Sequence, residues 1–376
     1  MCPEKSLNYG NQADHRSPRP GRRVAGVRAG TAFTAACARV SRVDVAVIGL
    51  GLIGGSVLRA LAAAGHRVLG YDADPATRAT ARTAAAKAPP AARWQVTATV
   101  RDAVARADLA VVAVPLPAVA GVLDQLADAG FSGLVTDVTS VKGPVHQLVG
   151  QRLHRLHDRL AGFVGGHPMA GRETSGFAAA DPELFADCSW VLCLEPGVTA
   201  LSDWLELAVL VTGLGARVVP ATPEEHDRAV AAVSHVPHLL AAALAATAAT
   251  DPLAGTLAAG SFRDGTRVAA TRPELVAAMC GGNAAAVGPA LDAVLTELAG
   301  ARTALAADDP IAALRTWLTP GCAARTAWPP APGKPLELPA RVETLIRLGR
   351  AGGWVTAVAD DRRTVTGVRP APVDPD

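Results

Sequence analysis

Residues 43–72, VDVAVIGLGLIGGSVLRALAAAGHRVLGYD, contain a glycine-rich turn set between a strand and a helix. The stretch begins with a short β-branched run of the kind that is buried on both faces of a parallel sheet. An apolar helical segment follows the glycines, and then a second strand that ends at an aspartate. The order strand, glycine turn, helix, strand predicts the first unit of a doubly wound α/β domain.

The glycines of this turn have the spacing of a dinucleotide site. Gly49, Gly51 and Gly54 form G-x-G-x-x-G, in which the first permits the turn, the second lets a pyrophosphate approach, and the third lets the helix pack on the strand. Asp72 lies about 20 residues further on, where a carboxylate accepts hydrogen bonds from a ribose 2′-hydroxyl and disfavours a 2′-phosphate. NAD is therefore predicted rather than NADP, although Arg78 lies nearby.

Further strands are predicted along the next hundred residues. In a doubly wound sheet, ligands bind beyond the carboxyl ends of the strands. We therefore expect Leu52 and Ile53 of the glycine turn, and Pro115 after a strand, to lie beside the cofactor. The alternative for Pro115 is a residue that only ends a strand and begins a helix. The predicted strands are residues 94–99, 109–114, 134–138 and 163–166.

The loop TSVKG, residues 139–143, follows one of these strands. A hydroxyl on Ser140 beyond the strand end can point toward the nicotinamide or the substrate. The alternative is an ordinary helix cap formed by Thr139 and Ser140, followed by a solvated Lys142. The sequence alone leaves both open.

Composition limits the ligand classes. Charged residues make up 19% of the 376 residues and the net charge is +2, which favours a small-molecule ligand over nucleic acid or an anionic membrane. The six cysteines form no C-x-x-C pair, so we expect neither a zinc site nor a disulfide framework and favour the cytoplasm. No stretch reaches the about 18 uninterrupted apolar residues of a membrane span.

The chain divides into four predicted segments. Residues 1–42 are a disordered or mis-assigned tail, with an export signal as the weaker alternative, and residues 43–221 form the dinucleotide-binding domain. Residues 222–328 form an all-helical domain whose wide alanine and leucine faces require a second copy, so a homodimer is expected. Residues 329–376 are predicted as a small appendage with a proline-rich linker, a short helix and a hairpin.

Four further motifs follow in order along the chain: DVTSVKG (137–143), GHPMAGRETSGF (166–177), SHVPHLLAAAL (234–244) and FRDGTRVAATRPELVAAMCGGN (262–283). These motifs resemble those of the prephenate/arogenate dehydrogenase family, and the resemblance runs from about Val43 to Leu318. It implies a Rossmann-type sheet followed by an all-helical dimerisation domain. The implied activity is oxidative decarboxylation of prephenate to 4-hydroxyphenylpyruvate, with hydride transfer to NAD, in tyrosine biosynthesis. The C-terminal segment departs from relatives that carry an amino-acid-sensing domain.

The implied chemistry requires a base for the C4 hydroxyl and a clamp for a carboxylate. Imidazole suits the base and arginine suits the clamp. The resemblance assigns His167 as the catalytic histidine, aided by Ser140, and Arg267 as the substrate-binding arginine. It also places Glu173 at the mouth of the site and His238 toward the substrate side chain.

Simpler interpretations exist for two of these groups. Arg267 can instead form a surface ion pair with Asp264 or Glu274. His235 and His238 could suggest a metal, but the pair lacks a third ligand and the chemistry needs no metal, so none is predicted.

Other functions are compatible with the same fold. The main alternative is arogenate dehydrogenase, which gives tyrosine directly. A non-catalytic NAD-sensing protein and a β-hydroxyacid dehydrogenase are further alternatives. The joint presence of His167, Ser140 and Arg267 favours an enzyme, because a sensor needs neither a base nor a carboxylate clamp.

Overall fold

The first sheet has the predicted doubly wound plan. The computed structural model describes residues 42–152, 162–172 and 174–371. Its first sheet is parallel, with strand order β3-β2-β1-β4-β5-β6. The chain reverses its winding direction between β1 and β4, which opens a crevice at their carboxyl ends. The strands are β1 Asp44–Ile48, β2 Arg67–Tyr71, β3 Gln95–Val96, β4 Leu109–Val112, β5 Leu134–Asp137 and β6 Gly162–Val164.

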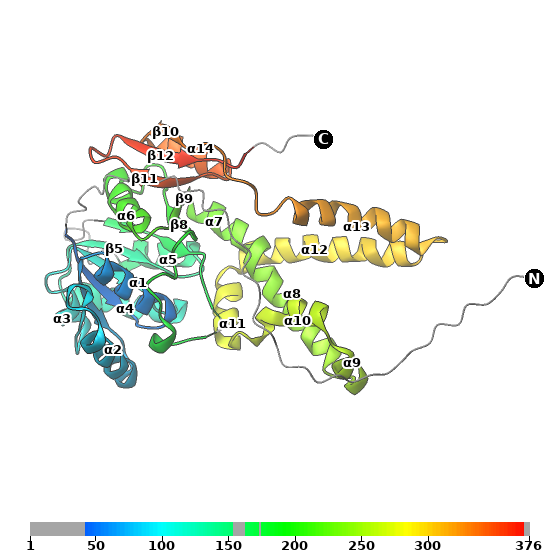
Figure 1. Ribbon diagram of the computed structural model, residues 1–376, viewed down its shortest axis with the longest axis horizontal. Helices are drawn as coiled ribbons and strands as arrows, with labels where there is room; N and C mark the ends of the chain where they lie inside the picture. The colour runs from blue at the N-terminus through cyan, green and yellow to red at the C-terminus, as the bar shows by residue number, and fades with distance from the viewer. Residues whose placement is uncertain (1–41, 153–161, 173, 372–376) are drawn as a thin grey trace, which may run out of the picture. The chain divides into compact units, whose positions relative to one another are not determined.

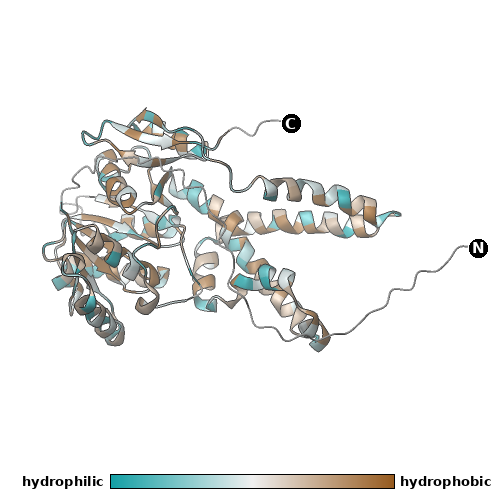
Figure 2. Ribbon diagram, viewed as in Figure 1, coloured by the Kyte–Doolittle hydropathy of each residue, from teal (hydrophilic) through white to brown (hydrophobic). Residues whose placement is uncertain are grey.

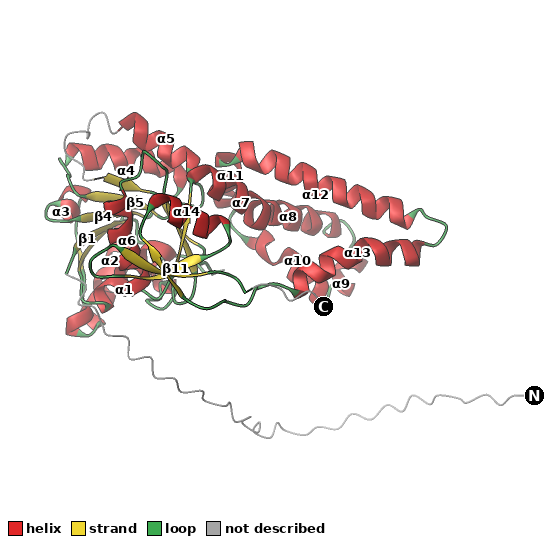
Figure 3. Cartoon of the chain, turned by 90° about the horizontal axis from the view of Figure 1, so that it is seen from above, coloured by secondary structure: helices red, strands yellow, loops and turns green. Residues whose placement is uncertain are grey.

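Helices cover both faces of this sheet (Figure 3). Val45 and Val47 of β1 are buried against α1, α2 and α6, whereas Ala46 and Ile48 are buried against α3, α4 and α5. Burial on both faces explains why β1 lacks polar alternation. The helices are α1 Leu52–Ala63, α2 Pro75–Lys87, α3 Val100–Val104, α4 Leu116–Asp128, α5 Gly143–Arg152 and α6 Leu201–Gly213, with a short 3₁₀ turn at Pro90–Ala92.

A second sheet was not expected from the sequence. The predicted strand 163–166 is wrong as a single element, because the chain leaves the first sheet after Val164 and enters the second at Gly166. The second sheet has the order β10-β12-β11-β9-β8-β7. Its first three strands along the chain are β7 Gly166–Pro168, β8 Ser189–Cys193 and β9 Arg217–Ala221, and a 3₁₀ turn spans Phe177–Ala179.

The C-terminal segment completes this second sheet (Figure 1). It contains β10 Leu336–Pro339, α14 Val342–Arg350, β11 Trp354–Val358 and β12 Thr364–Val368. Val355 of β11 pairs antiparallel with Val218 of β9, and Leu345 and Leu348 of α14 join the buried core. The predicted helix and hairpin are present, but they extend a shared sheet instead of forming a separate appendage.

The helical segment begins at a strongly specified N-terminus. Thr222 caps α7 and forms a capping box with Glu225, and Pro223 occupies the first turn. A π-helical turn, Ala231–His235, joins α7 to α8, and a 3₁₀ turn at Arg267–Ala270 follows α10. The helices are α7 Pro223–Val230, α8 Val236–Ala248, α9 Pro252–Leu257, α10 Gly260–Thr266, α11 Pro273–Gly282, α12 Ala284–Leu305 and α13 Pro310–Thr326.

Figure 2 shows many apolar residues along these helices, and the side chains of several of them are exposed. The helices α12 and α13 lie side by side, yet Leu305 is 60% exposed and Ile311 is 75% exposed. Leu257 of α9 is 71% exposed. Such an extended apolar surface is typical of an interaction site.

Candidate functional site

The glycine turn has the shape of a phosphate cradle. Gly49 has a φ of +99°, and a Cβ there would lie 2.3 Å from the Ala113 carbonyl oxygen. A Cβ on Gly54 would lie 2.0 Å from the Gly49 carbonyl oxygen, so both positions require glycine. A Cβ on Gly51 would face open space. The first turn of α1 has no side-chain cap and no acidic residue, so its amides can receive an anion. The turn therefore fits the pyrophosphate of a dinucleotide.

Asp72 is held at the end of β2 beside this turn. Its Oδ2 accepts a hydrogen bond of 2.7 Å from the Leu50 amide, and its Oδ1 accepts one of 2.8 Å from the Asp74 amide. Arg78 donates from Nη1 to the carbonyl oxygens of Asp72 and Ala73, at 2.6 and 3.0 Å. The Asp72 carboxylate thus lies where the sequence predicted the ribose-binding acid, and the Arg78 guanidinium is bonded to the adjacent backbone.

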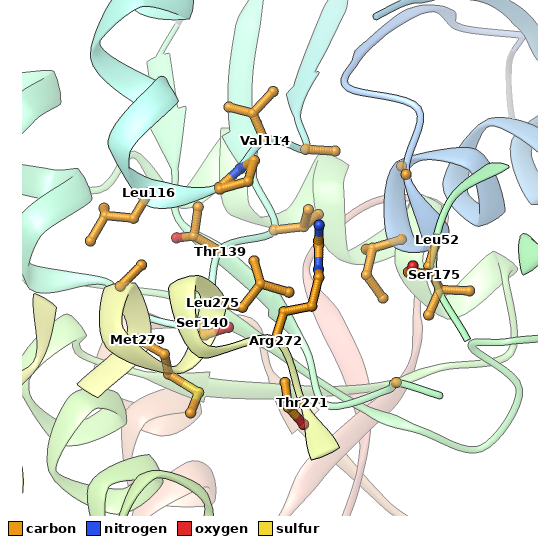
Figure 4. Close-up of a pocket in the computed structure, with 18 of the residues that line it drawn as sticks. Leu52, Val114, Leu116, Thr139, Ser140, Ser175, Thr271, Arg272, Leu275 and Met279 are labelled. Atoms are coloured by element: carbon orange, nitrogen blue, oxygen red, sulfur yellow. The ribbon is translucent and has the colours of Figure 1, made fainter. Parts of the chain in front are cut away.

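A cleft opens where the first sheet meets α11 (Figure 4). Ser140, Leu52 and Pro115 lie on the side of the cleft formed by the strand-end loops, while Arg272 and Met279 come from α11 and its N-cap. Pro115 also precedes α4, so its role in beginning a helix does not exclude a role in binding. The predicted residues that line this cleft are Gly51, Leu52, Ile53, Gly54, Pro115, Ser140 and His238.

A second cavity adjoins this cleft and contains the predicted anion clamp. Arg267 lines it, and His238 lines both cavities. The Nδ1 atom of His238 lies 2.9 Å from the Ser234 carbonyl oxygen, which can only accept, so Nδ1 is the donor and Nε2 is left for other contacts. Arg272 also lines both cavities. The structure therefore brings Ser140, His238 and Arg267 to two adjoining cavities that share His238.

His167 lies on β7, just before Ala170, which lines the cleft. The histidine itself is 8% exposed and lines neither cavity. Its Nδ1 lies 2.8 Å from Nε2 of His226 on α7. Burial lowers its pKa well below the ordinary value, and the neighbouring charges of His226, Lys142 and His235 act in the same direction. His167 is consequently neutral at physiological pH, as a base must be.

A buried ion pair lies beneath His167. Lys142 is fully buried, and its Nζ donates to Oδ2 of Asp137 and to the Gly166 carbonyl oxygen, the latter at 2.6 Å. Asp137 Oδ1 also accepts from the Gly166 amide at 3.2 Å. The solvated-lysine interpretation of Lys142 is therefore wrong, because a sequence pattern does not show that the chain turns its ammonium inward onto a strand-end carboxylate.

Asp227 connects the same loop to α7. Its Oδ1 accepts from the Lys142 amide and its Oδ2 from the Gly143 amide, both at 2.8 Å. Oδ1 also lies 2.8 Å from Nδ1 of His226. These hydrogen bonds keep the pKa of Asp227 below its usual value, although burial acts in the opposite direction. The sequence analysis missed both His226 and Asp227, since the run PEEHD indicated only an acidic first turn of a helix.

Of the remaining motif residues, His235 and Arg172 lie within the described part of the chain. Glu173 lies outside the described residues. His235 is fully buried, with Nδ1 3.2 Å from Asn283 Nδ2. Arg172 pairs with Asp181 at 2.5 Å. Within the described ranges, no group of three or more His, Cys, Asp or Glu side chains is arranged to hold a metal.

Comparisons with known proteins agree with this architecture. Residues 57–220 match the model of the prephenate dehydrogenase nucleotide-binding domain, and residues 222–319 match that of the prephenate dehydrogenase dimerization domain. Cyclohexadienyl dehydrogenase of Zymomonas mobilis is 34% identical over 281 residues, which cover 70% of this chain and 89% of that protein. The chain belongs to the prephenate dehydrogenase family. The predicted family and the Rossmann-type fold with a helical second domain are thus confirmed.

Two further relatives show the extent of the similarity. Prephenate dehydrogenase of Bacillus subtilis is 34% identical over 244 residues, but the match covers only 62% of that protein and 61% of this chain. A crystal structure of prephenate dehydrogenase from Aquifex aeolicus, in complex with hydroxyphenyl propionate and NAD+, is 25% identical with a TM-score of 0.65. That match covers 76% of this chain and 98% of the Aquifex chain.

Proposed function

We propose that the protein is an NAD-dependent prephenate dehydrogenase of tyrosine biosynthesis, which converts prephenate to 4-hydroxyphenylpyruvate and CO2. One observation carries the proposal: the nucleotide cleft adjoins a cavity lined by Arg267, and a neutral buried histidine lies next to the wall of that cleft. Membership of the prephenate dehydrogenase family supports the same chemistry. Arogenate, which carries an ammonium group in place of a ketone, is the alternative substrate.

The glycine turn, Asp72 and the loop at Pro115 are proposed to bind NAD. The α1 amides receive the pyrophosphate, and the Asp72 carboxylate accepts from the ribose 2′-hydroxyl. When bound, NAD supplies the hydride acceptor. The Aquifex relative, whose structure contains NAD+, supports this choice of cofactor. Ser140, at the strand end in the nucleotide cleft, is proposed to orient the nicotinamide and the substrate.

His167 is proposed to hold the proton of the C4 hydroxyl during the reaction. The proton moves to Nε2 as C4 becomes a carbonyl carbon. Loss of CO2 then restores the aromatic ring, and the C4 oxygen takes a proton back to become a phenol. The base is thus regenerated and no proton is consumed overall, so His167 needs only to accept and return one proton.

Arg267 is proposed to bind a substrate carboxylate, and His238 and Glu173 are proposed as further substrate-binding residues. Arginine can donate two parallel hydrogen bonds to a carboxylate, which fixes the ring relative to the nicotinamide. His238 lies between the nucleotide cleft and the Arg267 cavity, where its Nε2 can form a hydrogen bond with the substrate.

The protein is proposed to be a cytoplasmic homodimer. By length and composition alone, Pro223–Ala248 and Ala284–Leu305 could cross a membrane. The first of these spans contains His226 and Asp227 of the buried network, which lie against the nucleotide-binding part, and a second copy accounts for the exposed apolar faces. The match to a dimerization domain supports this assembly.

Steady-state kinetics with prephenate and arogenate, each with NAD and NADP, test the proposal. We expect prephenate with NAD to give the highest kcat/KM. A higher kcat/KM with arogenate would reassign the substrate, and no reduced nucleotide with either substrate would refute the proposed activity.

Two glycine variants test the nucleotide cradle separately from the fold. Gly51→Ala should leave the melting temperature nearly unchanged, because a Cβ there meets no atom, yet it should weaken NAD binding because the pyrophosphate approaches that position. Gly54→Ala should lower the melting temperature, because its Cβ would overlap the Gly49 carbonyl oxygen. Calorimetric titration with NAD and thermal unfolding measure both effects. Unchanged NAD affinity in Gly51→Ala would show that the cofactor binds elsewhere.

A further inference from the structure

A chain of buried polar groups runs away from His167 on the side opposite its Nε2. Nδ1 of His167 lies 2.8 Å from Nε2 of His226, and Nδ1 of His226 lies 2.8 Å from Oδ1 of Asp227. The side chain of His226 has no exposed surface, and that of Asp227 is 11% exposed. The three groups are therefore shielded from water along most of this path.

The direction of each hydrogen bond follows from Asp227. Its carboxylate already accepts from the Lys142 and Gly143 amides, which favours the ionised form. An ionised carboxylate can only accept, so Nδ1 of His226 carries a proton. Burial lowers the pKa of His226, although the hydrogen bond to Asp227 acts in the opposite direction, and the ring is neutral with a lone pair on Nε2.

The tautomer of His167 follows from that of His226. Because His226 Nε2 can only accept, the proton of neutral His167 must lie on Nδ1, which leaves the lone pair on Nε2. Nε2 makes no hydrogen bond within the described residues. In the described part of the chain, Nε2 of His167 is not one of the fully buried polar atoms that lack a hydrogen-bonding partner, so it retains access to solvent.

We infer that His226 and Asp227 are positioning residues for the proposed reaction: they hold His167 with Nε2 as the proton acceptor and stabilise the imidazolium that forms when it takes the substrate proton. The inference rests on the proposed function. No proton leaves along the chain, since the proton on Nε2 returns to the C4 oxygen. A histidine oriented by a second group is a recurring arrangement of general bases.

Asp227 has a second consequence for the site. Its two bonds to the Lys142 and Gly143 amides also fix the loop that carries Ser140. The same carboxylate thus sets the orientation of the base and the position of a residue in the nucleotide cleft. Substitution of Asp227 would disturb both, so His226 is the better position for a test.

Two variants of His226 separate its two hydrogen bonds. The amide of His226→Gln reaches toward the position of Nε2 and retains an acceptor for His167, but it loses the link to Asp227. The shorter amide of His226→Asn reaches toward the position of Nδ1 and retains the link to Asp227, but it loses His167. His146→Gln is the matched control, because His146 on α5 is a half-buried histidine whose pKa is also lowered by burial, and no hydrogen bond joins it to His167.

Both His226 variants should lower kcat by about 10- to 100-fold or more with little change in KM; the lower figures are those for partners that orient metal-binding histidines, and the loss is larger for a partner of a catalytic histidine in a triad. The charged and titratable groups that face His167 are His226 on α7, Lys142 after β5 and His235 on the π turn.

The pH dependence of kcat provides a second readout. In His226→Gln the acidic limb of the plot of kcat against pH should move to lower pH, because the His167 imidazolium loses the stabilisation from Asp227. His146→Gln should leave both kcat and the limb unchanged. A kcat within twofold of wild type in both His226 variants, or an unmoved limb in His226→Gln, would overturn the inference.

Imidazole ¹⁵N NMR of the wild-type protein tests the tautomers without any turnover. We expect both His167 and His226 to carry the proton on Nδ1. A proton on Nε2 of neutral His167 would overturn the inference even if the enzyme is active. Failure of the wild-type protein to turn over prephenate or arogenate would instead refute the proposed function, and the NMR result would still decide the tautomer.

Discussion

The network beneath His167 places charged side chains in the interior, whereas the surface of α12 and α13 exposes apolar side chains to solvent. Each is the reverse of the usual distribution in a protein. In the network, Lys142 and Asp137 are almost completely buried, and each has hydrogen-bonding partners within the chain. On the helices, Leu305 and Ile311 are 60% and 75% exposed. The polar region is complete in a single chain, whereas the apolar region is not. In the proposed function, the orientation of the base is therefore built within one protomer, and the proposed second copy covers the exposed apolar side chains of the helices.

The largest expected effect is loss of the dimer. Wild-type protein should sediment at twice the chain mass of 38.2 kDa at micromolar concentration. The double variant Leu305→Asp, Ile311→Asp should sediment as a monomer, because charges on an apolar contact surface lose water without gaining a partner. Val198→Asp is the control, since Val198 is 70% exposed but lies between β8 and α6. A monomeric wild-type protein would contradict this account of the exposed leucines.

The next effect concerns the buried ion pair. Lys142→Met should lower the free energy of unfolding by about 3–5 kcal/mol, because it leaves the Asp137 carboxylate buried without its counter-charge. Arg228→Ala removes an exposed pair with Glu224 and should cost no more than about 0.5 kcal/mol. Urea unfolding measures both values. Equal losses in the two variants would show that burial does not decide the strength of these pairs.

A smaller effect is the dependence of stability on pH. Burial lowers the pKa of His146 and of His235 to about 4 in the folded protein, whereas an unfolded histidine has a pKa of about 6.5. The unfolded chain therefore binds protons first as the pH falls. The contribution of these two histidines to stability should be constant above about pH 7 and should fall between pH 6.5 and 4, by up to about 1.4 kcal/mol per pH unit for each group.

His235→Asn provides the matched comparison for this slope. Its amide oxygen can take the place of Nδ1 beside Asn283 while removing the titrating ring. The variant should therefore show a shallower loss of stability on acidification than wild type in thermal unfolding measured at several pH values. An unchanged slope would mean that folding does not lower the pKa of His235.

The sequence was sufficient for those parts of the fold that depend on local patterns. The glycine turn, Asp72 and the strands that lead to Pro115 and Ser140 all follow from short β-branched runs and from residue spacing along a short stretch of chain. The switch at Gly165 from the first sheet to the second could not be predicted, because FVGG is equally compatible with one continuous strand. The pairing of β11 with β9 joins segments more than a hundred residues apart, and no local signal announces it.

The candidate site divides in the same way. Arg267, His238 and His167 were recognised because they stand in motifs with a family resemblance. His226 and Asp227 act through contacts with residues that are distant in sequence, namely His167, Lys142 and Gly143. Lys142 was ambiguous because the direction of a lysine side chain after a strand depends on where a carboxylate lies in three dimensions. Only the tertiary structure shows that the Lys142 side chain is buried and not solvated.

The kinetics of His167→Asn, compared with Arg267→Gln, test the central claim most directly. We expect His167→Asn to lower kcat by about 100- to 10,000-fold with little change in KM, because a base acts mainly in the transition state. Arg267→Gln should instead raise the KM for prephenate steeply, because a carboxylate clamp binds the ground state and the transition state alike. A nearly normal kcat in His167→Asn would contradict the account, and His238 would then be the first candidate for the base.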